Sequence, residues 1–299
     1  MDAENRPPTP VTMKRIIPIL ALLLAGCGHT PQSAEETVFV SIAPLKYIAE
    51  QIADSGTRIE VLVPETTSPE SYEPTVQQIK ALVEARAYIS TGLIDFEQAL
   101  AGKIREIAPD MKMLDLSEGI AVLENGSSRD HSGHRHGTDP HIWLSPAIVS
   151  DMGHRIADLW TALRPDSAAL YHRRADRFAE RIDSLDRYIR RSLSGAKRTD
   201  FAIGHTSLTY FAADYGLGQI AIEADGKEPS VKTMKRLVDS LQRSGIKAVL
   251  FQRQTSDAAA RTIARELPGG RAVEFDPLAE NWLENMYRLT DSLQVILNE

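Results

Sequence analysis

Four segments of the chain place a side chain that could bind a metal beside a proline turn or at the end of a predicted strand. They are residues 69–74 (PESYEP), 139–144 (DPHIWL), 204–206 (GHT) and 275–278 (FDPL). Their candidate ligands are two imidazoles and two carboxylates, namely Glu70, His141, His205 and Asp276. Two carboxylate charges cancel the charge of a divalent cation, which lowers the cost of burying the ion. The residue types therefore predict a site for a divalent transition metal.

Each segment taken alone also fits an ordinary structural role. A histidine beside a proline is more often a turn residue than a ligand, and an Asp-Pro pair at a strand end is usually a turn. The spacing differs from His-Glu-x-x-His, and the only cysteine, Cys27, excludes a cysteine-based zinc finger and an intramolecular disulfide framework. Two histidines with two carboxylates suit zinc, and they also suit manganese or iron, which accept oxygen donors readily.

The elements that must position these side chains form two series of alternating strands and helices. In the first series we predict strands at 37–42, 58–63, 87–90 and 111–116, and helices at 44–52 and 75–85. In the second we predict strands at 201–204, 219–222, 248–252 and 272–275, and helices at 207–215, 231–244, 257–266 and 280–297. Alternation of this kind predicts parallel α/β units, in which ligands bind beyond the carboxyl ends of the strands. All four candidate segments fall in such strand-to-helix loops.

Between the two series lies the strongest helical pattern in the chain. Ser145-Pro146 opens a helix to about Leu163, and Pro165 opens another to about Leu193. Apolar residues recur in the second helix at steps of four and three: Tyr171, Ala175, Phe178, Ile182, Leu185 and Ile189. We therefore predict an α/β fold of two lobes with parallel sheets, covering 37–144 and 198–299. One long helix within 145–197 would bridge them, with the metal site in the cleft between the lobes.

The N-terminus has the features of a targeting segment. Residues 13–27 read MKRIIPILALLLAGC, in which two basic residues precede nine mostly apolar ones. That run is too short to span a bilayer, and it fits a secretory signal. It ends in a sequence resembling a bacterial lipobox, in which the cysteine is lipidated and becomes the mature first residue. We predict a signal peptide at 1–26, with translation starting at Met13. Residues 27–36 would form a tether whose lipidated Cys27 anchors the chain to the membrane.

Charge and histidine content add two further expectations. The chain has 34 basic and 41 acidic residues, for a net charge of −7 without a basic block, which argues against nucleic-acid binding. Residues 126–139 (GSSRDHSGHRHGTD) form a polar loop with His131, His134 and His136. Short histidine-rich tracts can bind metal. The loop either collects zinc, more weakly than the cleft because it loses entropy on binding, or is an ordinary solvated segment.

From about residue 37 to 299 the chain resembles the cluster A-I substrate-binding proteins of metal-uptake ABC transporters, the zinc-binding type in particular. The matching stretches are 62–64 (LVP), 72–75 (YEPT), 139–144, His205 with 210–211 (YF), 215–217 (YGL), 225–230 (DGKEPS) and 276–278 (DPL). The resemblance implies a monomeric, non-enzymatic lipoprotein that captures zinc in the periplasm and delivers it to a membrane permease. The ATPase is a separate chain, since no Gly-x-x-x-x-Gly-Lys-Ser/Thr motif is present.

The resemblance also implies a ligand set. His141 and His205 match two histidine ligands of the family, and Asp276 matches its carboxylate ligand. The family's first histidine, directly after Pro69, is replaced here by Glu70. A carboxylate can bind zinc at about 2.0–2.2 Å, so Glu70 remains a candidate, with a water molecule as the alternative in that position. Histidine at position 205, where manganese binders have a carboxylate, favours zinc, and manganese or iron remains the alternative cargo.

Two other functions fit the same residues. A metallohydrolase would need an open metal position and a general base, a role that Glu70 could take if it does not bind the ion. A surface adhesin could use the same fold with a purely structural metal, because a fold alone does not determine function.

Overall fold

The computed structural model describes residues 36–124, 137–223 and 229–299. Cys27, the predicted signal and nearly all of the predicted tether lie outside the described residues, and so do His131, His134 and His136. None of the helices in the described ranges combines the length and the apolar character needed to cross a bilayer.

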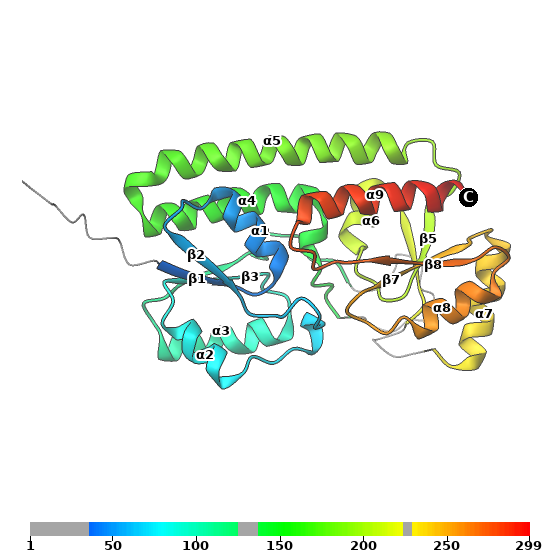
Figure 1. Cartoon of the computed structure of the whole chain (residues 1–299), viewed down its shortest axis with the longest axis horizontal. Coiled ribbons are helices and arrows are strands. Elements are labelled where there is room, and N and C mark those ends of the chain that lie inside the picture. Colours follow the sequence, from blue (N-terminus) through cyan, green and yellow to red (C-terminus); the bar gives the residue numbers. More distant parts are fainter. Residues whose placement is uncertain (1–35, 125–136, 224–228) are drawn as a thin grey trace, which may run out of the picture. The chain divides into compact units, whose positions relative to one another are not determined.

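The N-terminal lobe is a parallel sheet of four strands in the order β2-β1-β3-β4. Its elements are β1 (Glu36–Val40), α1 (Ala43–Ile52), β2 (Thr57–Val61), the 3-10 turn η1 (Pro69–Ser71), α2 (Val76–Val83), β3 (Ala87–Ser90), α3 (Asp95–Ile107) and β4 (Lys112–Asp115). Helices α2 and α3 cover one face of the sheet, while α1 lies on the other (Figure 1). The strands at the centre are apolar on both faces, as expected of a parallel sheet covered on both sides.

The C-terminal lobe repeats this topology with the order β6-β5-β7-β8, again all parallel. Its elements are β5 (Asp200–Ile203), α6 (Thr209–Tyr215), β6 (Gly218–Ala221), α7 (Val231–Arg243), β7 (Ala248–Gln252), α8 (Ala258–Glu266), β8 (Arg271–Phe275) and α9 (Trp282–Asn298). The two series therefore fold alike although their sequences show no obvious repeat.

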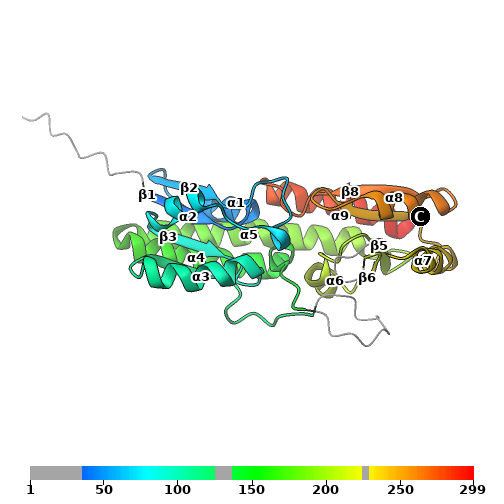
Figure 2. The same ribbon diagram turned by 90° about the horizontal axis from the view of Figure 1, so that it is seen from below.

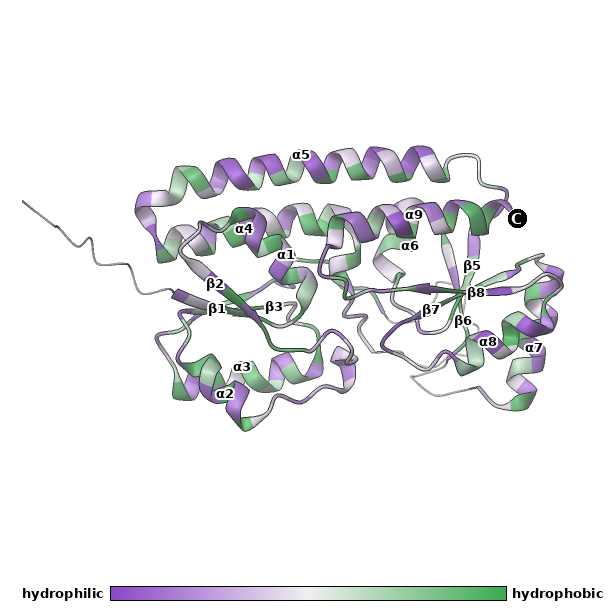
Figure 3. Ribbon diagram, in the orientation of Figure 1, coloured by the Kyte–Doolittle hydropathy of each residue, from purple (hydrophilic) through white to green (hydrophobic). Residues whose placement is uncertain are grey.

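Long helices connect the lobes and pack against both. The chain passes through η2 (Ile142–Leu144), α4 (Pro146–Leu163) and η3 (Pro165–Ser167) into α5 (Ala168–Leu193), which packs on α4, α1 and α9. In both Figure 1 and Figure 2, α5 runs along α4 and α9 from one lobe to the other. The buried residues of α5 are the six that the sequence pattern predicts. Figure 3 shows the mixed polar and apolar character of this helix.

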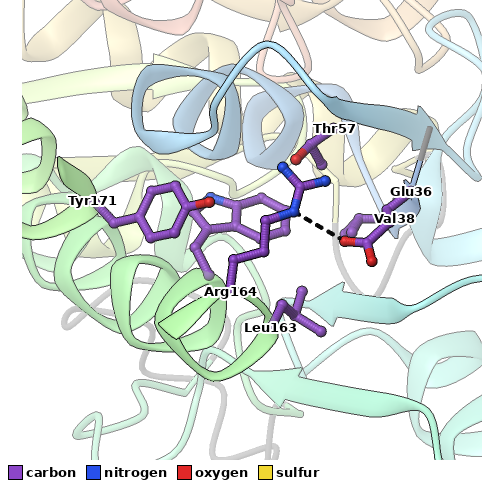
Figure 4. Close-up of a pocket in the computed structure, with 7 residues that line it drawn as sticks. Glu36, Val38, Thr57, Leu163, Arg164 and Tyr171 are labelled. Carbon is purple, nitrogen blue, oxygen red and sulfur yellow. Dashed lines mark hydrogen bonds and ion pairs between the residues drawn. The ribbon is translucent and has the colours of Figure 1, made fainter. Parts of the chain in front are cut away.

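The beginning of β1 is fixed to the end of α4 by an arginine (Figure 4). Arg164 donates from Nε to Glu36 Oε2 at 3.2 Å and from Nη2 to the Gly56 carbonyl at 3.0 Å, and it also pairs with Asp54. Asp54 in turn accepts a hydrogen bond from the Tyr171 hydroxyl at 2.8 Å. Arg164, Glu36 and Tyr171 line the small pocket drawn in Figure 4.

The predicted fold class and nearly all predicted elements are confirmed, with ends that shift by one or two residues. The capping box of Thr75 and Gln78 is present at the start of α2. The sequence analysis missed one helix, α3, whose buried apolar residues Phe96, Leu100 and Ile104 form only a narrow stripe. Its fourth buried residue is Glu97, which accepts hydrogen bonds from the backbone of Thr91, Gly92 and Ile94.

Candidate metal centre

Three of the predicted ligands lie together where the two lobes meet. One ligand atom each from Glu70, His141 and His205 falls within 4.8 Å of the other two. Glu70 Oε1 lies 2.9 Å from His205 Nε2 and 3.5 Å from His141 Nε2. The two imidazole rings stand edge to face, with centroids 5.6 Å apart. Residues more than 130 positions apart in the chain thus converge on one point.

Glu70 is carried by the turn η1, and a hydrogen-bond network fixes the loop around it. The Tyr72 hydroxyl donates to the Leu62 carbonyl at 2.8 Å, and Gln78 Nε2 donates to the same carbonyl at 2.8 Å. Gln78 also closes the capping box with Thr75 at the start of α2. The loop after β2 is therefore tied to both β2 and α2, so that Glu70 projects from a braced turn.

His141 is buried and is oriented by the acidic residue two positions before it. Asp139 Oδ1 accepts from the His141 backbone N–H at 2.8 Å and lies 2.8 Å from His141 Nδ1. When the ring Nδ1–H donates to Asp139 Oδ1, Nε2 presents its lone pair toward Glu70. The Tyr210 hydroxyl of α6 donates to the Asp139 carbonyl at 3.0 Å, which links this segment to the C-terminal lobe.

His205 follows β5 directly and belongs to the C-terminal lobe. Its side chain is 9% exposed, and a second carboxylate, Glu223, places Oε2 3.8 Å from its Nδ1. Gln252 at the end of β7 reaches the His205 carbonyl at 3.5 Å. The carboxyl ends of adjacent parallel strands thus gather around this histidine, as the rule for open α/β sheets predicts.

The charges at the centre favour an ionised pair in the absence of a metal. Burial lowers the pKa of His205, but its contacts with Glu223 and Glu70 outweigh burial and raise the pKa to about 10. Burial raises the pKa of Glu70, whereas the hydrogen bond with His205 and the charges of both histidines lower it, for a net decrease. Metal binding must therefore displace a proton from His205.

The separations of Glu70 from the two histidine nitrogens are close to those around a small divalent cation. Ligand bonds of about 2.0–2.1 Å in a tetrahedral arrangement place neighbouring ligand atoms about 3.3 Å apart. The 3.5 Å between Glu70 and His141 already matches, and the 2.9 Å between Glu70 and His205 must open slightly. Two nitrogens and one oxygen are donors that zinc accepts, with one position left for a fourth ligand.

Asp276, the fourth predicted ligand, is not part of the group of three. Its Oδ1 accepts from Gln254 Nε2 at 2.7 Å and from the Leu278 backbone N–H at 2.9 Å. Its Oδ2 lies 3.4 Å from Arg253 Nη1. Gln254 Nε2 also donates to the Glu65 carbonyl of the other lobe at 3.0 Å. In this structure the Asp276 carboxylate is therefore engaged by its own lobe.

Two residues of the centre were missed as contributors by the sequence analysis. Asp139 was noted only as part of the segment that contains His141, yet it orients the histidine ring. Glu223 gave no local signal, because its contact with His205 depends on the pairing of β5 with β6. The tryptophans Trp143 and Trp282 are buried and donate hydrogen bonds to the Pro277 and Trp143 carbonyls.

Comparison with known proteins shows which family the chain matches. A family model described as the periplasmic component A of zinc-uptake complexes matches residues 38–295. The zinc-binding lipoprotein AdcA of Streptococcus pneumoniae is 28% identical over 272 residues, which cover 85% of this chain and 53% of AdcA. The chain thus spans about half the length of that relative. The high-affinity zinc uptake system protein ZnuA of Bacillus subtilis is 26% identical, with 84% of each chain covered.

Solved structures agree with the fold. A zinc-bound deletion mutant of ZnuA superposes with a TM-score of 0.80 and 34% identity, covering 88% of this chain and 98% of that one. A second ZnuA crystal structure gives a TM-score of 0.80 at 33% identity, covering 88% of this chain and 99% of the other. The match to the family model extends over nearly the whole described region. With its two parallel lobes and its centre of Glu70, His141 and His205, the chain belongs to the family of the periplasmic component A of zinc-uptake complexes.

Proposed function

We propose that this protein captures zinc outside the cytoplasm and delivers it to the permease of an ABC transporter, whose ATPase is a separate chain. The observation that carries the proposal is the convergence of Glu70, His141 and His205 from separate elements of the two lobes. The family match and the zinc-binding relatives support the choice of zinc. Zinc is here the cargo of a binding protein rather than the cofactor of an enzyme.

The proposed ligands are Glu70 Oε1, His141 Nε2 and His205 Nε2, with Asp276 as the fourth. Asp276 joins the shell by exchanging its contacts with Gln254 and the Leu278 N–H for the ion. A water molecule in the fourth position is the alternative outcome. In either arrangement the protein supplies at least three of the four ligands.

The proposal extends to the parts of the chain outside the described residues. Cys27 is the proposed site of lipidation, and residues 28–35 tether the folded unit to the bacterial membrane. The histidines at 131, 134 and 136 form an auxiliary zinc-collecting loop. The binding protein acts as a monomer that meets its permease at the membrane surface.

A metal-competition titration of the purified protein tests the proposal. Zinc and manganese binding are measured by calorimetry against a competing chelator, for the wild type, His205→Ala and the control His172→Ala, which alters an exposed histidine of α5. We expect 1:1 zinc binding that His205→Ala weakens by about 100-fold or more and that His172→Ala leaves unchanged. A preference for manganese would change the cargo, and zinc binding of wild-type affinity in His205→Ala would refute the site.

A further inference from the structure

A carboxylate stands behind His205, on the edge of the ring that faces away from Glu70. Glu223 Oε2 lies 3.8 Å from His205 Nδ1, while His205 Nε2 lies 2.9 Å from Glu70 Oε1. The Glu223 side chain is 11% exposed, so its charge is only weakly screened by water. We propose that Glu223 is a positioning residue for metal binding, holding the His205 imidazole so that Nε2 presents its lone pair to the ion.

The backbone places Glu223 there independently of its charge. Strands β5 and β6 pair in parallel with Ile203 opposite Ala221. The pairing continues past both strands, because Ile222 N–H donates to the Ile203 carbonyl at 2.9 Å and Glu223 N–H donates to the Gly204 carbonyl at 3.0 Å. Residue 223 is thereby held beside the histidine, and replacing its side chain leaves these hydrogen bonds in place.

The other histidine of the centre shows the same arrangement from a different element. Asp139 Oδ1 lies 2.8 Å from His141 Nδ1, and His141 Nε2 faces Glu70. Metal-binding histidines generally donate their second ring N–H to a carboxylate or carbonyl, which fixes the tautomer and makes the ligand more basic. Each histidine of this centre therefore has its own carboxylate, one from the segment between the lobes and one from the C-terminal lobe.

Metal binding is expected to tighten the contact with Glu223. The Glu70–His205 separation of 2.9 Å must open to about 3.3 Å around a tetrahedral zinc ion, which moves the His205 ring away from Glu70. The side of the ring that advances carries Nδ1, so the 3.8 Å to Glu223 shortens toward hydrogen-bond length. Glu223 itself does not bind the ion, because the ring of His205 lies between them.

The experiment compares Glu223→Ala and Glu223→Gln with Glu65→Gln, which alters an exposed carboxylate on the loop leading to Glu70. Zinc affinity is measured by competition, and the His205 ring nitrogens are observed by ¹⁵N NMR with and without zinc. We expect Glu223→Ala to lose about 10–100-fold in affinity, as for other outer-shell partners. Glu223→Gln should keep most of the affinity, since its amide oxygen still accepts the Nδ1 proton, and Glu65→Gln should match the wild type.

The outcomes separate this proposal from the proposed function on which it rests. A purely structural role would lower the melting temperature of both Glu223 variants alike, without a difference in zinc affinity between them and without a change at the His205 nitrogens. Wild-type affinity and an unchanged His205 spectrum in Glu223→Ala would overturn the positioning role while leaving zinc capture intact. If the wild type bound no zinc but Glu223→Ala still altered the metal-free His205 signals, the proposal of zinc capture would be wrong. The contact between Glu223 and His205 would still be supported.

Discussion

The two lobes share one sheet topology but differ in how their cores are built. In the N-terminal lobe, residues on both faces of the sheet belong to a single large core, which also includes α4, α5, α9 and one face of the C-terminal sheet. The outer face of the C-terminal sheet forms a separate, smaller core with α7 and α8. Leu241 is the single buried residue of α7 among those described. The shared core is therefore one cooperative unit, whereas the outer layer of the C-terminal lobe is a local addition to it.

The same contrast holds at the metal centre. The N-terminal lobe supplies Glu70 from a turn that is followed by Tyr72, which packs against the large core and hydrogen-bonds to the Leu62 carbonyl. The C-terminal lobe supplies His205, with Glu223 behind it, from strand ends that lie between the two cores. The difference teaches that lobes of the same topology can support their ligands differently, one from a turn packed against the large core and the other from the ends of paired strands.

The largest effect is expected from removing a side chain that the shared core depends on. Phe178→Ala empties a buried position on α5 and should lower the free energy of unfolding by about 3–5 kcal/mol. Urea denaturation followed by circular dichroism measures this loss. The matched variant Leu241→Ala should instead increase local proteolysis and amide exchange in α7, with a smaller shift of the global transition. If Phe178→Ala and Leu241→Ala lowered the global free energy of unfolding equally, the division into two cores would be contradicted.

Zinc affinity should rise steeply with pH through the neutral range. His205 must lose its proton to bind zinc, and with a metal-free pKa of about 10 it is still protonated at pH 7. Affinity should therefore increase about tenfold per pH unit between pH 6 and 8, a total of about 2.7 kcal/mol. An ordinary histidine pKa near 6.5 would make the affinity level off above pH 7. Calorimetry in two buffers of different ionisation enthalpy measures the released proton directly.

In the metal-free protein, raising the pH has the opposite effect: it lowers the stability of the fold, whereas it raises the affinity for zinc. Because contacts with Glu223 and Glu70 raise the folded pKa of His205, they contribute stability fully below the unfolded pKa near 6.5, and this contribution is lost as the pH rises through about 10. Glu70→Gln is the control, since it removes one of the two charges that raise the pKa of His205. If zinc affinity depended on pH with the same slope in Glu70→Gln as in the wild type, the Glu70–His205 pair would not be the cause of that dependence.

The sequence was sufficient to predict elements whose pattern is local. The six buried residues of α5 and the two parallel lobes follow from spacing and composition. Three of the four predicted ligands converge, since strand ends in parallel sheets gather at one edge. What the sequence could not supply depends on contacts between distant segments. Examples are the role of Glu223, set by strand pairing, and the engagement of Asp276 by Gln254.

A close approach between the long helices offers a finer test of the shared core. A Cβ atom added at Gly153 of α4 would lie 2.9 Å from Phe178 Cδ1 on α5, closer than side chains tolerate. Gly153→Ala should therefore destabilise the protein by about 1–3 kcal/mol despite the better helix propensity of alanine. The control is Gly102→Ala in α3, where a Cβ meets nothing within 4 Å. Thermal denaturation should show Gly102→Ala unchanged or more stable, and the reverse order would refute the packing argument.

A smaller effect is expected at the fourth ligand of the C-terminal lobe. Asp276→Asn keeps an oxygen that can accept from the Leu278 N–H but removes the charge offered to zinc. If Asp276 joins the shell, zinc should bind about tenfold more weakly, or about 1.4 kcal/mol. Glu274→Gln is the matched control, because Glu274 pairs with the same Arg253 at 3.1 Å from an exposed position. Wild-type affinity in Asp276→Asn would leave water as the fourth ligand.

The smallest effect is expected from the exposed ion pair that joins the lobes at the surface. Lys46 Nζ on α1 lies 2.8 Å from Glu280 Oε1 just before α9. Exposed pairs contribute about 0.2–1 kcal/mol, so Lys46→Met should change the free energy of unfolding by less than about 1 kcal/mol and leave zinc affinity unaltered. The lobes are instead held by buried contacts such as Trp143 Nε1 on the Pro277 carbonyl at 2.8 Å and Trp282 Nε1 on the Trp143 carbonyl at 2.7 Å. Suppose instead that Lys46→Met lowered the free energy of unfolding by several kcal/mol at low salt and had no effect at high salt. Surface charge, rather than the shared core, would then join the two lobes.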